Sequence, residues 1–257
     1  MGQTAENLIR DDDFCWGEFH EWYWNGFKCH WRVLGEANNP PIVFIHGFGA
    51  SSAHWRRNAS FFSKAGFRVY GLDLIGFGLS DQPGPSKKKL NNYFWSKQLS
   101  TFLEEIVLNK SYQQAILIGN SLGGLVAITT ASMRDDLVKA VISSPLPDPA
   151  FMQKVEFPEI AFLKRIVHFL VHMFFYLLPL ELIVPIIART SIIKKALQLA
   201  YHRSVKDDRD LLRLVNTPAK RNTAPRALRA MCIGMTLRPY SYTAPYFLNQ
   251  LSARLKK

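Results

Sequence analysis

The sequence is poor in cysteine, with three residues at positions 15, 29 and 232 of 257. They are too few and too scattered for a disulfide framework or a cysteine-based zinc site, so we expect reduced thiols in a cytoplasmic compartment. A secretory signal is not evident, because residues 1–6 have no apolar core and run toward three aspartates at 11–13. Glu6 stands where a myristoylation site needs Ser or Thr, which argues against that modification.

Acidic residues are scarce in the second half of the chain. Residues 1–150 carry 14 Lys/Arg and 14 Asp/Glu, whereas residues 151–257 carry 18 and 6, so the net charge of +12 arises there. A basic, apolar second half predicts peripheral contact with an anionic membrane surface; the alternative is that a missing acidic segment balances it. The basic residues show no nucleic-acid-binding motif, so nucleic acid is not an expected partner.

Short apolar runs alternate with helical patterns over the first 150 residues. Aromatic and β-branched residues flank Asn25-Gly26, which predicts a β-hairpin over 19–35 with a type I′ turn. Continuous apolar runs typical of strands buried on both faces lie at 42–45, 67–72, 115–118 and 138–142. Helical spacing lies between them, near 51–65, 92–109 and 122–134. This order predicts an α/β fold with a mostly parallel sheet.

The second half lacks a strong strand pattern, and residues 150–250 are predicted to be helical. Its most apolar stretch, 166–187, is long enough to cross a bilayer, but Pro179 and Pro185 would break a single helix. We therefore expect two or three short helices that form a lid. The predicted domains are an N-terminal extension at 1–18, an α/β core at 19–148 and a helical cap at 149–257.

The strongest chemical signal is the run Gly119-Asn120-Ser121-Leu122-Gly123-Gly124, which follows a strand pattern and opens a helical one. A serine on such a turn presents its hydroxyl at the positive end of the helix. The glycines at 119 and 123 permit close packing of strand and helix because they have no Cβ. We therefore predict Ser121 as a nucleophile.

A second motif, His46-Gly47-Phe48-Gly49, directly follows the apolar run at 42–45. A tetrahedral acyl intermediate needs two fixed N–H donors, which we expect from the amides of Phe48 and Leu122. Gly47 and Gly49 would let the loop approach the substrate. His46 is expected to orient this loop rather than to transfer protons.

The third motif, DLIGFGLSD at residues 73–81, suits a tight loop, so Asp73 and Asp81 are expected to be structural. Together the three motifs resemble the α/β-hydrolase superfamily, from about residue 19 to 148. The phrases HGFGASSAHWRRN, DLIGFGLSDQP and GNSLGG are similar to cyanobacterial and chloroplast hydrolases of the pheophytinase and chlorophyll-dephytylase type. This resemblance implies a cofactor-free enzyme that cleaves a lipophilic ester, such as a phytyl or acyl ester.

The resemblance also implies the chain order serine, acid, histidine, but no strand followed by Gly-Asp comes after the helical segment 244–255. We therefore expect the last strands, with the acid and the histidine, to be missing, and the remaining sheet edge to promote aggregation. Asp148 is the candidate for an alternative acid position. His168, His172 and His202 are expected to be polar tips of the lid, because no nearby acid or cysteine completes a metal site.

Three functional hypotheses remain open. The first is a carboxylic ester hydrolase that acts through Ser121, with this chain inactive if the acid and the histidine are missing. The second is a non-catalytic, shortened protein that uses the pocket of the fold for binding. The third is a carbon–carbon bond hydrolase or a cofactor-free haloperoxidase. Dehalogenases and epoxide hydrolases are disfavoured, since the resemblance implies Asp at the nucleophile position in those enzymes.

Overall fold

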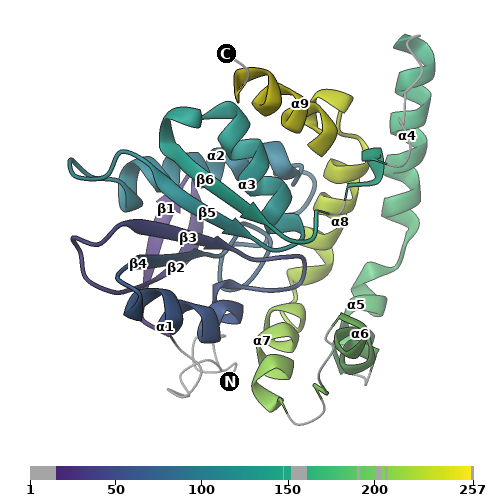
Figure 1. Ribbon diagram of the computed structural model, residues 1–257. Coiled ribbons are helices and arrows are strands. Elements are labelled where there is room, and N and C mark those ends of the chain that lie inside the picture. Colours follow the sequence, from purple (N-terminus) through teal and green to yellow (C-terminus); the bar gives the residue numbers. More distant parts are fainter. Residues whose placement is uncertain are drawn as a thin grey trace.

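The computed structural model describes residues 16–146, 148–151, 161–189, 192–200, 204–205 and 208–255. Its centre is a sheet with the strand order β1-β2-β4-β3-β5-β6, covered by helices (Figure 1). The strands are β1 (Glu18–Trp24), β2 (Phe27–Leu34), β3 (Pro41–Ile45), β4 (Arg68–Leu72), β5 (Ala115–Gly119) and β6 (Val138–Ser143). Because β3, β4, β5 and β6 pair in parallel, the predicted α/β fold with a mostly parallel sheet is confirmed.

The N-terminal hairpin is also confirmed. β1 pairs antiparallel with β2, with Trp24 opposite Phe27. Asn25 and Gly26 form the turn, and their φ angles of 48° and 77° are the left-handed values that a type I′ turn requires. β2 then pairs antiparallel with β4, so the hairpin forms one edge of the sheet.

The central strand β3 is buried on both faces, as its apolar run predicts. Val43 and Ile45 pack into the cluster that contains side chains of α2 (Asn92–Phe102) and α3 (Leu122–Met133). Ile42 and Phe44 pack on the other face, against residues of the 3₁₀ turn η3 (Ser52–Trp55) and α1 (Arg56–Lys64). α2 continues into a π-helical turn, η4 (Leu103–Val107). Residues that alternate along one strand thus hold helices on opposite faces.

The exposed sheet edge expected where the last strands are missing is confirmed at β6, whereas the burial on both faces expected from its apolar run was wrong. Its apolar run is typical of a strand buried on both faces, but β6 pairs with β5 alone and forms the second edge of the described sheet. Ile142 is 55% exposed, and Lys139 and Ala140 are exposed as well. An apolar run does not reveal whether a neighbouring strand covers it, so the pattern could not separate an edge from the interior.

Beyond residue 148 the described elements are helical, as predicted. They are η6 (Pro149–Phe151), α4 (Ala161–Leu177), α5 (Leu180–Arg189), α6 (Ile192–Ala200), α7 (Arg209–Ala219), α8 (Ala224–Thr236), η7 (Tyr240–Tyr242) and α9 (Ala244–Leu255). The expected break in the stretch 166–187 lies at Pro179, between α4 and α5. The expectation that Pro185 also breaks it was wrong, because Pro185 lies inside α5. Its missing amide removes one helical hydrogen bond, yet α5 continues through it.

Helix α9 packs on the core, although the predicted cap, 149–257, includes it. The Ser132 hydroxyl of α3 lies 3.4 Å from the Gln250 side-chain oxygen of α9. Just before α9, the ring of Tyr242 stacks on Tyr93 of α2 with centroids 4.3 Å apart. Helix α4 lies farther from the sheet, on the far side of α8 (Figure 1). The chain therefore leaves the core after β6 and packs against it again with α8 and α9.

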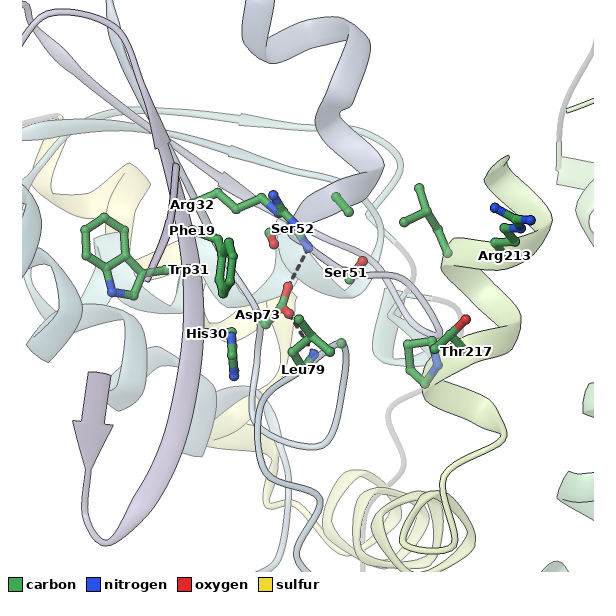
Figure 2. Close-up of a pocket in the computed structure, with 14 residues that line it drawn as sticks. Phe19, His30, Trp31, Arg32, Ser51, Ser52, Asp73, Leu79, Arg213 and Thr217 are labelled. Carbon is green, nitrogen blue, oxygen red and sulfur yellow. Dashed lines mark hydrogen bonds between the residues drawn. The ribbon is translucent and has the colours of Figure 1, made fainter. Parts of the chain in front are cut away.

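The loop after β4 is held in place by two aspartates. Asp73 Oδ1 accepts a hydrogen bond from the Ser52 amide at 2.6 Å, and Oδ2 accepts one from the Leu79 amide at 2.8 Å (Figure 2). Asp81 Oδ2 accepts a hydrogen bond from the Lys28 amide at 2.9 Å. Both carboxylates therefore connect loops to their neighbours, which agrees with the structural roles expected from the motif.

Removing the Asp73 carboxylate should destabilise the fold. Asp73→Ala leaves two amides without their acceptor in a buried setting, so we expect the free energy of unfolding to fall by about 3 kcal/mol. Urea unfolding followed by tryptophan fluorescence measures this change. Glu36→Ala, at an exposed carboxylate, is the control and should change stability by less than about 0.5 kcal/mol. Equal effects of the two variants would contradict the bracing role.

Candidate active site

Ser121 lies on the bend between β5 and α3, and β5 lies between β3 and β6 in the sheet. Its φ of 52° and ψ of −118° lie in a region that non-glycine residues rarely adopt, at a cost of roughly 1–3 kcal/mol. Of the other non-glycine residues that the structure describes, only Asn25 has a positive φ. The predicted strand–turn–helix setting is therefore confirmed. It places Ser121 at the N-cap of α3, the positive end of the helix dipole.

Three glycines make this bend sterically possible. A Cβ on Gly123 would lie 2.2 Å from the carbonyl oxygen of Ile45, and one on Gly119 would lie 2.4 Å from the carbonyl carbon of Gly123. A Cβ on Gly124 would lie 2.1 Å from the Ser143 hydroxyl oxygen. These separations are far below van der Waals contact, so α3 begins closer to the strands than any side chain would allow.

His46 is buried directly after β3, and both of its ring nitrogens are engaged. Its Nε2 accepts a hydrogen bond from the Leu74 amide at 3.1 Å, so the ring proton lies on Nδ1 and is donated to the Gly47 carbonyl oxygen at 2.8 Å. Burial lowers the pKa of His46 and keeps the ring neutral. These contacts agree with the loop-orienting role expected for His46 and leave no ring nitrogen for proton transfer to or from Ser121.

The loop that carries Phe48 lies directly against the Ser121 bend. A Cβ on Gly47 would approach Asn120 Oδ1 to 2.8 Å and Ser121 Cβ to 3.3 Å. The Phe48 amide donates to no backbone carbonyl of the described residues. Leu122 opens α3, where the first amides of a helix have no intrahelical acceptor. The two predicted oxyanion donors therefore belong to segments that meet at Ser121, while their catalytic role stays a prediction.

No histidine is hydrogen-bonded to Ser121 within the part of the chain that the structure describes. Burial lowers the pKa of His54 to about 4, so this ring is neutral at physiological pH. His172 Nδ1 lies 2.8 Å from the carbonyl oxygen of His168, one turn away on α4. His202 lies outside the described residues. Among described side chains no cluster of three His, Cys, Asp or Glu could hold a metal ion.

Asp148, the predicted alternative acid, is buried with its carboxylate already bound. Oδ1 accepts hydrogen bonds from Arg238 Nη2 at 2.6 Å and from the Ala150 amide at 3.0 Å. Oδ2 accepts one from the Ala244 amide at 2.7 Å, at the start of α9. A catalytic acid would instead accept a hydrogen bond from a histidine ring. These contacts favour a structural role for Asp148. The sequence gave no indication of Arg238 as its partner, because the two residues are 90 positions apart.

A pocket lies apart from this site, between β2, the loop after β4 and α7 (Figure 2). It encloses about 640 Å³, its open mouth included. The side chains that line it include Phe19, His30, Arg32, Asp73 and Thr217. Neither Ser121 nor Phe48 lines this pocket, and both oxygens of Asp73 are engaged by backbone amides. The pocket therefore does not hold the predicted nucleophile.

The fold and part of the sequence are similar to known hydrolases. A family model described as alpha/beta hydrolase fold matches residues 40–164. The Cif epoxide hydrolase from Acinetobacter nosocomialis superposes with a TM-score of 0.67 at 18% identity, over 98% of this chain and 74% of that one. A thioesterase domain from the curacin biosynthetic pathway gives a TM-score of 0.55 at 19% identity, over 78% and 67%. The chain therefore has the α/β-hydrolase fold, and residues 40–164 match the family model.

Curated relatives match part of the chain. Epoxide hydrolase 3 from Xenopus tropicalis is 32% identical over 126 residues, which are 49% of this chain and 33% of that protein. Pimeloyl-[acyl-carrier protein] methyl ester esterase from Wigglesworthia glossinidia brevipalpis is 30% identical over 132 residues, 51% of this chain and 44% of that protein. The matches thus span less than half the length of these relatives. These relatives carry the names of epoxide and ester hydrolases, so the similarity does not point to a single reaction.

The backbone strain at Ser121 should be measurable as a difference in the free energy of unfolding between two variants. Ser121→Gly and Ser121→Ala both remove the hydroxyl, but glycine adopts a φ of 52° without strain, so Ser121→Gly should be more stable by about 1 kcal/mol. Urea unfolding gives both values. Ser144, exposed just after β6, serves as the control, where Ser144→Gly should be no more stable than Ser144→Ala. Equal stability of the two Ser121 variants would show that the bend is unstrained.

Proposed function

We propose that this protein is a serine hydrolase that cleaves a carboxylic ester, with Ser121 as the nucleophile. The observation that carries the proposal is the position of Ser121, strained at the N-terminus of α3 and beside the loop that holds the Phe48 amide. A hydroxyl that faces backbone amides at a helix N-terminus suits attack on an acyl carbon, because negative charge develops on the carbonyl oxygen next to them.

In the proposed reaction Ser121 Oγ attacks the ester carbonyl carbon, and the carbonyl oxygen becomes an oxyanion held by the amides of Phe48 and Leu122. Collapse of this intermediate releases the alcohol and leaves an acyl group on Ser121. Water then attacks the acyl group, which releases the acid and restores the hydroxyl. A base must take the proton from Ser121 at the first step and give it to the leaving alcohol, and it must then take a proton from the attacking water and return it to Ser121. No described histidine is hydrogen-bonded to Ser121, so the proposal places this base outside the described residues.

The serine itself favours ester cleavage over epoxide opening. A carboxylate that opens an epoxide forms an ester, which water can hydrolyse. A serine that opened an epoxide would form an ether, which water does not cleave under mild conditions, so the enzyme would not turn over. The relatives named epoxide hydrolases therefore share the fold with this chain, but Ser121 is better suited to acyl transfer.

The substrate is proposed to be a lipophilic ester of the phytyl or acyl type. Two features support this class: the motif resemblance to chlorophyll-dephytylating hydrolases, and the apolar side chains that α4 and α5 expose. Long hydrocarbon chains require an apolar surface near the catalytic centre, and the helical cap is where the selectivity of such sites is expected to reside.

A second candidate function is a non-catalytic binding protein. It is favoured by one observation, the absence of a hydrogen bond between Ser121 and any described histidine. The two functions differ in the reactivity of the serine, because only an activated hydroxyl reacts with an electrophilic phosphonate.

A fluorophosphonate probe tests the proposal. In an extract of the cells that make the protein, the probe should label it at Ser121, as located by mass spectrometry of the tryptic peptide. Ser121→Ala should abolish labelling, while Ser144→Ala, which alters an exposed hydroxyl just after the neighbouring strand, should leave it unchanged. Absence of labelling in the wild-type protein would overturn the hydrolase and favour the binding protein. Hydrolysis of styrene oxide that persists in Ser121→Ala would instead indicate epoxide chemistry elsewhere.

The oxyanion hole can be tested through Gly47. In Gly47→Ala the new methyl group would press on Asn120 and Ser121 and move the loop that carries the Phe48 amide. We expect the rate of probe labelling to fall by roughly 10²-fold, as for the loss of one oxyanion donor. Gly66→Ala is the control for an added methyl group, since a Cβ there meets no other atom, although its own φ of 86° carries strain. An unchanged rate in Gly47→Ala would remove Phe48 from the proposed site.

A further inference from the structure

The outward surface of α4 and α5 is apolar, which reverses the usual pattern of a surface helix. On α4 the side chains of Phe169, Leu170, Phe174 and Leu177 are 58–73% exposed. On α5 Leu182 and Ile186 are 67% and 59% exposed. A helix that faces water normally turns its polar residues outward. We call the surface formed by these six side chains the α4–α5 face.

The junction of the two helices is fixed to α8 by one buried arginine. Arg229 donates hydrogen bonds to the carbonyl oxygens of Phe175 and Leu178, at 2.8 and 2.9 Å, where α4 ends. Its Nη2 also donates to Glu181 Oε2 at 2.8 Å, at the start of α5. Arg229 therefore satisfies carbonyls at the end of α4 and neutralises the acid that begins α5. This anchoring leaves the six apolar side chains turned away from the protein.

The geometry suits shallow insertion rather than crossing. No single helix of the described chain is both long and apolar enough to span a bilayer. Arg165–Leu177 and Leu180–Ala188 are long and apolar enough only when taken together, and they bend by 52° at the break between them. A helix that lies in the plane of the membrane interface needs one apolar face on the lipid side and anchoring on the other, and the pair has both.

The charge around this face is positive. Among the side chains that the structure describes in α4, α5 and α6, Arg165, Lys194 and Lys195 are basic and Glu181 is the single acid. Glu181 is paired with Arg229, so its charge is already compensated. Helix α6, which packs against α5, carries Lys194 and Lys195 and exposes Leu199. Such a combination of apolar and basic residues complements anionic lipid headgroups above an acyl layer, whereas two copies of the face would bring like charges together.

The core of the fold is not placed to cover this surface. Helix α8 packs on the core, where the Leu90 amide donates to the Ala230 carbonyl oxygen, and α4 packs on the other side of α8. The open edge of the described sheet is β6, on the far side of α8 from α4 (Figure 1). A strand added at β6 would therefore extend the sheet without reaching the α4–α5 face.

We propose that the α4–α5 face inserts in the plane of an anionic lipid bilayer, with Lys194 and Lys195 of the adjacent α6 at the headgroups. Membrane binding would concentrate the protein where lipophilic molecules are dissolved. The proposal rests on exposure and charge alone, so it stands or falls independently of the chemistry at Ser121.

Vesicle flotation with the full chain tests the proposal. The protein should float with vesicles of phosphatidylcholine and phosphatidylglycerol, and more weakly with phosphatidylcholine alone. The combined variant Phe169→Gln, Phe174→Gln and Leu177→Gln should reduce the partition coefficient by about tenfold or more. Phe61→Gln is the matched control, because Phe61 is a similarly exposed phenylalanine, 68% exposed, on α1 of the core; it should bind as the wild type does.

A second variant separates charge from apolar contact. Lys194→Gln with Lys195→Gln should lower binding to the anionic vesicles by about tenfold while leaving binding to phosphatidylcholine unchanged. This variant also decides the matter if circular dichroism shows that the triple variant is unfolded.

Two outcomes would overturn the proposal. One is a wild-type protein that floats with neither vesicle, or variants that float equally well. The other is a lipid-free dimer that sedimentation velocity detects, that the triple variant dissociates and that vesicles do not bind; the face would then be an interface between copies.

Discussion

The described core depends on the close approach of the first turn of α3 to the carboxyl ends of β3 and β5. At Gly119 and Gly123 backbone meets backbone, and at Gly124 the missing side chain leaves room for the Ser143 hydroxyl; the positive φ of Ser121 follows from the direction change. Strained backbone persists where the surroundings over-determine it. Here the surroundings are the buried strand β3, the cluster around α2, and the Asn120 side chain, which donates a hydrogen bond to the Ser144 carbonyl oxygen.

The segments that follow β3 and β4 are joined at two points beside the bend. His46 links the loop after β3 to Leu74 in the loop after β4, and Asp73 links that same loop to Ser52. Each link consists of a buried polar side chain that satisfies backbone groups, and such links hold only if every partner is present. The position of the Phe48 amide relative to Ser121 therefore depends on both of these segments.

Local chemistry explains what could be read from the sequence. The hairpin turn, the strands and the bend at Ser121 are each encoded by residues that are neighbours in the chain, and all three are confirmed. Non-local features could not be read in this way. The docking of α9 on α3 and the pairing of Asp148 with Arg238 depend on segments that meet only after folding. The same limit applies to the catalytic base, because a histidine partner of Ser121 is recognised by its position in space rather than by its spacing.

The hydrogen bond between Asp148 and the Ala244 amide has a topological consequence. It joins the point where the chain leaves the sheet to the point where the chain comes back, so the intervening helices form a loop with its two ends fastened together. A closed insertion of this kind can change in length and sequence without altering the distance that the core must bridge. Substrate selectivity and surface binding could thus diverge within the insertion while the bend that carries Ser121 remains as it is.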